Sequence, residues 1–329
     1  MENARIRINL RLFEDRTNTT GSDGLSAEMK TFYDRNLLEN AEPELVHDQW
    51  AQTRDIPKNG GKKIEFRRYE QLPKALTPLT EGVTPEGQDL SVATLEAEVK
   101  QYGGFVRLSD VLILTAIDNN IVEATDLIGS QAGLTLDTIS REIMNAGTNV
   151  VYGDGTVTSR NAITADMKLN FRTVKIAVRA LEVQHAKKFD GYYAGIIHYD
   201  TKFDLTEDER FIEVVKYKNP ERIYKNEIGE IAGVRFVSTS EAKKFVGAGA
   251  GGIDVYSTLI IGKNAYATTK VEGGGLKTII KQLGSAGTED PLDQRATVGW
   301  KALKVTEILS EQYMVRIETA SSFNDGEAN

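Results

Sequence analysis

The residue types that most often carry metal or nucleophilic chemistry are scarce in this sequence. It contains no cysteine and only three histidines, His47, His185 and His198. Without cysteine the chain can form neither a disulfide nor a thiolate metal site, and it lacks a cysteine nucleophile. The histidines are scattered and lack the His-x-x-x-His spacing that places two imidazoles on one helix face. We therefore expect no zinc or two-histidine iron site, and no cofactor.

The glycine-rich segment 247–252 is the one stretch that could suggest phosphate binding. A phosphate loop leaves a strand and opens a helix, whose first amides face the anion. Here the next residues read IDVYSTLII, which is typical of a strand, and no Gly-Lys-Ser/Thr follows. No Gly-x-Ser-x-Gly elbow marks a serine nucleophile. The sequence thus predicts a surface loop at 247–252 and no catalytic residue in the chain.

Composition and charge restrict the class of partner. The chain has 329 residues, of which 27% are charged, and its net charge is -8. No apolar run approaches the roughly 20 residues needed to cross a bilayer, and the first residues lack the apolar core of a secretory signal. We therefore expect a cytoplasmic product with no membrane partner. The acidic balance argues against sequence-independent DNA binding, although a protein that only encloses DNA need not be basic.

Residues 56–108 combine alternating strand patterns with a proline-rich centre, which predicts a long two-stranded excursion. Residues 58–74 carry six basic residues against two acidic ones, whereas residues 81–98 carry five acidic residues and no Lys or Arg. These charges either pair across the hairpin or reach a neighbouring copy. Because an isolated hairpin is marginal in water, we favour contacts between copies. The candidate contact residues are Lys62, Lys63, Arg67, Arg68, Glu81, Glu86 and Asp89.

Two long helices are expected beyond this excursion. Apolar residues recur at steps of three or four over 120–146, which predicts a helix of about 40 Å. Within it, Gly129 and Gly133 permit a neighbouring backbone to come close. A second helix is predicted over 164–188, and His185 continues its apolar stripe. We interpret His185 as a packed helix histidine and not as a ligand.

The remaining segments predict an N-terminal arm, a short helix and several late strands. Apolar residues alternate with polar ones over 5–12, as in an extended strand, and a polar linker follows. This strand either docks on its own domain or adds to a neighbouring subunit, and the sequence favours neither. A short helix near 26–39 and strands over most of 277–317 complete a mixed chain of the α+β class.

Several stretches together resemble the major capsid proteins of tailed bacteriophages, and most closely the family named for coliphage N-four within the wider Hong Kong ninety-seven fold. The resemblance covers nearly the whole chain, with its motifs in order. Each motif is weak alone, but seven in register are specific. They are INLRLF at 8–13, AEPELVH at 41–47, IPKNGGK at 56–62, LTEGVTP at 79–85, LTAID at 114–118, GEIAGVRF at 229–236 and RATVGWK at 295–301.

The resemblance implies a phage capsid fold with an N-terminal arm, an extended loop, a long spine helix, a peripheral domain and an inserted axial domain. The expected regions are the arm and short helix at 1–50, the extended loop at 51–110, the peripheral domain with its spine helix at 111–160, the axial domain at 161–290 and the return strands of the peripheral domain at 291–329.

The resemblance also implies a role in assembly and no enzymatic activity. Copies of such a chain form the pentamers and hexamers of an icosahedral shell around double-stranded DNA, built in the host cytoplasm and retained in the virion. The implied partners are further copies, a portal, a separate scaffolding protein, in some relatives a cement protein, and DNA held by weak nonspecific contacts. Two alternatives stay open: an encapsulin-like shell around protein cargo, and a soluble α+β enzyme.

Overall fold

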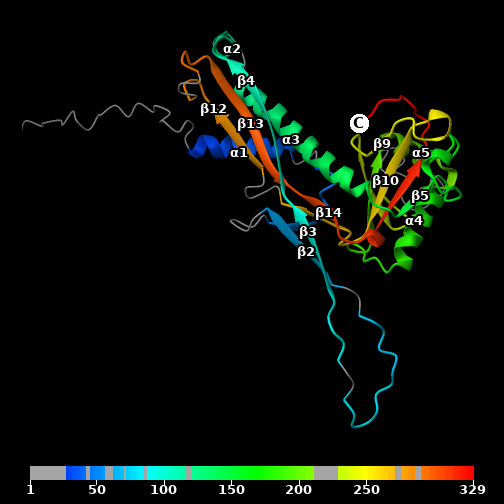
Figure 1. Cartoon of the computed structure of the whole chain (residues 1–329). Coiled ribbons are helices and arrows are strands. Elements are labelled where there is room, and N and C mark those ends of the chain that lie inside the picture. Colours follow the sequence, from blue (N-terminus) through cyan, green and yellow to red (C-terminus); the bar gives the residue numbers. More distant parts are fainter. Residues whose placement is uncertain are drawn as a thin grey trace, which may run out of the picture. The chain divides into compact units, whose positions relative to one another are not determined.

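The computed structural model describes nine stretches of the chain: residues 27–41, 45–55, 62–69, 72–84, 87–115, 120–210, 229–270, 276–285 and 290–329. Helices and strands are mixed along it, which confirms the predicted α+β class (Figure 1). The chain divides into two compact units. The first takes in the described parts of 1–40, 103–130 and 277–301, and the second those of 41–102, 131–276 and 302–329. The predicted N-terminal arm lies outside the described residues.

The first unit contains a three-stranded sheet and helical segments, two of which pack closely together. The sheet has the order β12 (Leu276–Lys281), β13 (Arg295–Lys304), β4 (Lys100–Ser109). The helices are α1 (Ala27–Ala41), α2 (Asp110–Thr115) and the first part of α3 (Asn120–Met144). A Cβ atom at Gly129 of α3 would lie 3.0 Å from the carbonyl oxygen of Leu37 in α1. The prediction that Gly129 admits a close backbone neighbour is confirmed.

The second unit is built around a seven-stranded sheet. Its order is β5-β15-β10-β6-β8-β7, and β9 also pairs with β10. All seven residues of β10 are buried, and so are all six of β15, as expected for central strands covered on both faces. The bounds are β5 Val150–Tyr152, β6 Tyr193–His198, β7 Glu230–Ile231, β8 Val234–Thr239, β9 Lys244–Phe245, β10 Val255–Ile261 and β15 Met314–Thr319.

Further short elements complete the second unit. A small sheet joins three strands in the order β1-β11-β14, and β2 pairs with β3 as a separate hairpin. Their bounds are β1 Gln52–Arg54, β11 Tyr266–Thr269, β14 Thr306–Ile308, β2 Lys63–Tyr69 and β3 Val92–Glu98. The helices are α4 Phe171–Val183 and α5 Tyr199–Glu207, with 3-10 turns at Arg160–Ala162, Ala250–Gly252 and Glu311–Tyr313. None of the described helices is both long and apolar enough to span a bilayer.

The second predicted helix is shorter than expected. The side chain of Asn170 accepts a hydrogen bond of 2.9 Å from the backbone N–H of Thr173, so α4 begins at residue 171 and not near 164. The helix ends at Val183, and His185 has a φ of 55°, in the left-handed region. His185 is exposed. The interpretation of His185 as a packed helix residue is therefore wrong, because the helix stops before reaching it.

The predicted two-stranded excursion and the predicted long helix are both present in the structure. The β2–β3 ladder runs from the pair Lys63–Glu98 to the pair Tyr69–Val92. It is shorter than the predicted range of 56–108, because β4 leaves the hairpin to join β13. The long helix is confirmed with an end at Met144. The division of the chain into five regions stays a prediction.

The C-terminal half of α3 buries polar side chains where an apolar stripe was expected. Ala124, Ile128, Ala132 and Leu136 are buried as predicted, but Ile139 and Ile143 are only half-buried. In their place Asp137, Ser140 and Arg141 are buried. Both carboxylate oxygens of Asp137 accept hydrogen bonds from His47, one from its backbone N–H and one from its Nδ1, at 2.7 Å each. Arg141 donates to the carbonyl oxygen of Glu241 at 3.0 Å.

A second buried cluster extends this arrangement to β13 and β14. The hydroxyl of Ser140 donates to Asp48 at 2.7 Å and lies 2.9 Å from the hydroxyl of Thr306. The other oxygen of Asp48 accepts a hydrogen bond from Lys304, whose side chain is 0% exposed. The phenol of Tyr266 donates to the carbonyl of His47, and burial raises the pKa of that phenol. Segment 45–50, α3, β11 and β14 are thus joined by buried polar contacts.

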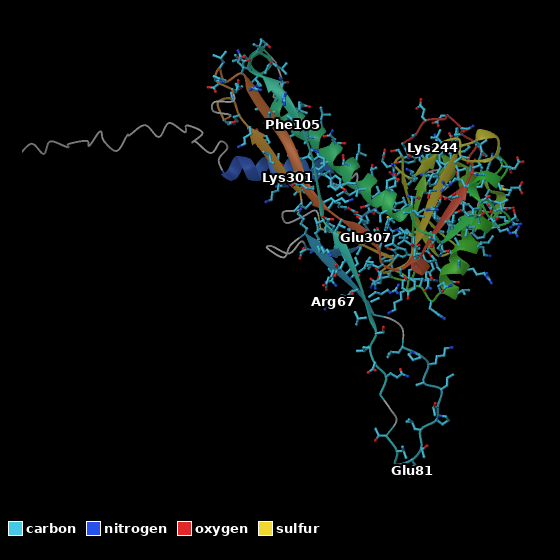
Figure 2. The ribbon with its side chains drawn as sticks, in the orientation of Figure 1. Arg67, Glu81, Phe105, Lys244, Lys301 and Glu307 are labelled. Atoms are coloured by element: carbon cyan, nitrogen blue, oxygen red, sulfur yellow. The ribbon has the colours of Figure 1, made fainter. Side chains whose placement is uncertain are left out.

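We predict that Lys304→Met lowers the stability of the folded chain by about 3 kcal/mol, because it leaves the carboxylate of Asp48 without its charged partner. The matched control is Lys301→Met, three residues earlier on the same strand, where the side chain is exposed (Figure 2). That change should alter stability by no more than about 0.5 kcal/mol. Denaturant unfolding measures both. Equal midpoints for the two variants would show that the buried pair does not stabilise the fold.

Candidate assembly surface

The hairpin of β2 and β3 has one packed face and one exposed face. Ile64, Phe66 and Ala97 are buried in a cluster with Ala267 and Val305 of the second unit. Lys63, Glu65 and Arg67, which alternate with Ile64 and Phe66 along β2, are exposed. This period-2 alternation is the expected behaviour of a half-buried strand. The base of the excursion is therefore anchored by apolar contacts, while its charges face outwards.

Some of the predicted contact charges are partnered within the chain. Lys63 forms an ion pair of 2.8 Å with Glu96 across the ladder, and both side chains are more than half exposed. That hydrogen bond lowers the pKa of the Glu96 carboxyl and raises the pKa of the Lys63 ammonium. Arg67 lies 3.4 Å from Glu65 on its own strand. Cross-strand pairing thus accounts for one of the candidate residues, Lys63.

The remaining candidates fall at the two ends of the hairpin. Lys62 is exposed, and its carbonyl accepts the N–H of Val99 at 2.8 Å where the ladder begins. Arg68 donates to the carbonyl of Leu309 at 3.0 Å. Glu81 and Asp89 are exposed beyond the other end of the ladder. Glu86 lies outside the described residues.

The excursion beyond the ladder carries exposed apolar side chains that the sequence interpretation overlooked. Leu76 is 82% exposed, Leu79 77%, Leu90 70% and Val83 63%. Single exposed hydrophobic residues are ordinary, but a group of them on one segment indicates a contact surface. Their scatter among prolines and charges hid the pattern in the sequence. Figure 1 shows this segment running out from β2 and β3 as an open loop.

Arg67 and Arg68, near the end of the ladder from which the excursion leaves, also line a hollow. The other lining residues come from β1, from the turn after α4, and from the loops at 263–264 and 309–313, and the volume is about 810 Å³. Sequence reasoning missed the basic members outside the hairpin, because they belong to separate segments. Among the described residues, no group of three or more His, Asp or Glu could hold a metal ion. The hollow and the excursion can therefore provide charge and apolar contact, but the described residues offer no metal centre for chemistry.

The ion pair between Lys63 and Glu96 should depend on pH. Because the folded pKa of Glu96 is lowered, the pair is present above the pKa of an unfolded glutamate, about 4.3, and is lost as the pH falls through the folded value. An NMR titration of the Glu96 carboxyl should show a midpoint below that of an unfolded glutamate, and Lys63→Met should raise that midpoint. An unchanged midpoint in the variant would mean that Lys63 does not pair within its own hairpin.

Comparisons with known proteins place this geometry among phage capsids. The cyanophage Pam1 capsid aligns with a TM-score of 0.64 and 14% identity, over 86% of this chain and 93% of that one. The capsid of cyanophage P-SCSP1u aligns with a TM-score of 0.63 and 14% identity, over 83% of this chain and 87% of that one. The capsid of Ralstonia phage GP4 aligns with a TM-score of 0.61 and 15% identity, over 86% of this chain and 87% of that one. No protein-family model and no curated protein sequence matches the chain. The chain has the Hong Kong ninety-seven-like fold of phage capsid proteins.

Proposed function

We propose that this chain is the major capsid protein of a tailed bacteriophage, whose copies form the pentamers and hexamers of an icosahedral shell around double-stranded DNA. The observation that carries the proposal is the extent of the likeness to phage capsids. It spans 83–86% of this chain and 87–93% of the capsid chains compared. A match of this extent cannot rest on one common sheet alone. The role is structural and no reaction is assigned to it.

The surface of the hairpin and its excursion supports the proposal independently of the likeness. A free subunit leaves Leu76, Leu79 and Leu90 more than two thirds exposed. Burying one leucine side chain contributes about 1.5–3 kcal/mol, so a neighbouring copy that covers this segment gains stability. The loop also has little packing of its own. Its described contacts include a hydrogen bond from Val83 to Thr80 and a marginal one of 3.5 Å from Gln88 to Pro73.

Within this function, finer assignments rest on the sequence motifs. We assign the chain to the family named for coliphage N-four, with the five regions predicted from the motifs and the virion capsid as its location. The charged residues of the hairpin and excursion act as contacts between copies. The proposed partners besides further copies are a portal, a separate scaffolding protein and, where one exists, a cement protein. DNA is enclosed with weak nonspecific contact, consistent with a net charge of -8.

The direct test is to express the chain, first alone and then with the scaffolding protein encoded beside its gene, and to examine the products by sedimentation and electron microscopy. Pentamers, hexamers or closed particles are expected. A stable monomer or dimer under both conditions would contradict the proposal. Terminase and portal genes next to the coding gene would separate a phage capsid from a cargo shell.

We predict that Leu76→Asp combined with Leu79→Asp lowers particle yield about tenfold or more, because two charges would be buried in a contact that is apolar in the assembled shell. The melting temperature of the free subunit should not change, since both side chains are exposed there. The matched control exchanges the same two leucines for isoleucine and should still assemble. Normal particles from the aspartate variant would show that these side chains stay in solvent in the shell.

A further inference from the structure

The basic hollow in the second unit gathers positive charge from four separate segments. Its positive and titratable lining residues are Arg54, Arg67, Arg68, His185, Lys187 and Lys263. None of its described lining residues is an aspartate or a glutamate. The backbone N–H of Lys263 donates to the carbonyl of Lys187 at 2.8 Å, which holds two of the contributing segments together. Positive charge is thus concentrated in one concave site.

The counter-charges within reach only partly neutralise this site. Arg67 has Glu65 at 3.4 Å, and Arg68 donates to the carbonyl of Leu309 at 3.0 Å. Lys187 and Lys263 are exposed and form no ion pair with any described residue. Like charges held close together repel one another, and an anionic group between them relieves that repulsion. The geometry therefore favours a ligand that carries several negative charges.

A matching set of negative charges lies on the same chain but out of reach of this hollow. Glu81 and Asp89 are exposed on the excursion, and neither forms an ion pair with a described residue. Figure 2 shows Glu81 at the far end of the excursion from Arg67 on β2. The excursion leaves the ladder beyond the last pair, Tyr69–Val92, and runs away from Arg67, so in this structure Glu81 does not reach the hollow of its own copy. These carboxylates can meet such a hollow only on another molecule.

We propose that the hollow of one copy receives the acidic part of the excursion, around Glu81 and Asp89, of a second copy. This inference rests on the proposed shell function and names the pairing that links the copies. A volume of about 810 Å³ suits several side chains of an extended segment. Duplex DNA is the less favoured occupant, because the chain as a whole carries a net charge of -8 and repels a polyanion.

The test is a charge exchange between the two surfaces. One variant combines Lys187→Glu with Lys263→Glu, a second combines Glu81→Lys with Asp89→Lys, and a third carries all four changes. Each double reversal should reduce particle yield about tenfold or more, because like charges then meet at every repeated contact. The fourfold variant should recover to within about twofold of the original yield. Lys175→Glu, at an exposed lysine on α4 outside the hollow, is the control and should assemble normally.

A folding control and a second variant make the outcomes distinct. The melting temperature of each free subunit shows whether it folds, and if the lysine reversals unfold it, Lys187→Gln with Lys263→Gln replaces them. A fourfold variant no better than the double reversals would overturn the pairing, even though the original chain assembles. Failure of the original chain to form any oligomer would instead contradict the shell function. Loss of binding to a short DNA duplex without loss of particles would assign the hollow to phosphates.

Discussion

The buried carboxylate of Asp137 and the half-buried carboxylate of Asp48 are the constraint on which the second unit depends. Each is held by groups from another part of the chain: Asp137 by His47, and Asp48 by Ser140 and Lys304. A buried charge that loses its partner costs several kcal/mol, so these segments meet in one arrangement only. The helix α3 is therefore fixed in register against the segment that leads into β1, and against β14.

That arrangement positions the base of the hairpin. β1 pairs with β11, and β11 pairs with β14. Ala267 of β11 and Val305 just before β14 form the floor on which Ile64 and Phe66 of β2 pack. The polar cluster and the apolar cluster thus share the same strands. The hairpin is therefore joined to α3 through packed elements: β11 contacts the hairpin, and the hydroxyls of Thr268, Thr306 and Ser140 link β11 to α3.

The excursion combines an anchored base with an unsupported end. Phe66 is buried at the base, whereas Leu76 and Leu79 are almost fully exposed. A segment with few internal contacts is free to adapt to a partner, while a fixed base limits where it can reach. This division suits a subunit that must repeat the same contact in slightly different surroundings, as pentamers and hexamers require under the proposed function.

Features that depend on local pattern can be predicted from the sequence alone. The spacing of apolar residues predicted α3 to within two residues of its end, and alternation predicted β2. The return strand β3 was expected from apolar residues whose spacing is less regular. The strand expected after the glycine cluster is β10, which begins at Val255. Ordered motifs predicted the capsid fold. Periodicity and cap residues act over a few neighbouring positions, so one sequence is sufficient to find them.

Only the tertiary structure decided which distant residues meet. Nothing in the local pattern marks Asp137 as buried, because its cost of burial is offset by His47, 90 positions away. The apolar spacing predicted that His185 extends the helix, but the helix ends at Val183 and His185 has a positive φ. The hollow joins Arg67 to Lys187 and Lys263 although the three lie far apart in sequence. Charge and burial at such sites depend on contacts between segments, and the sequence of one segment carries no information about its partner.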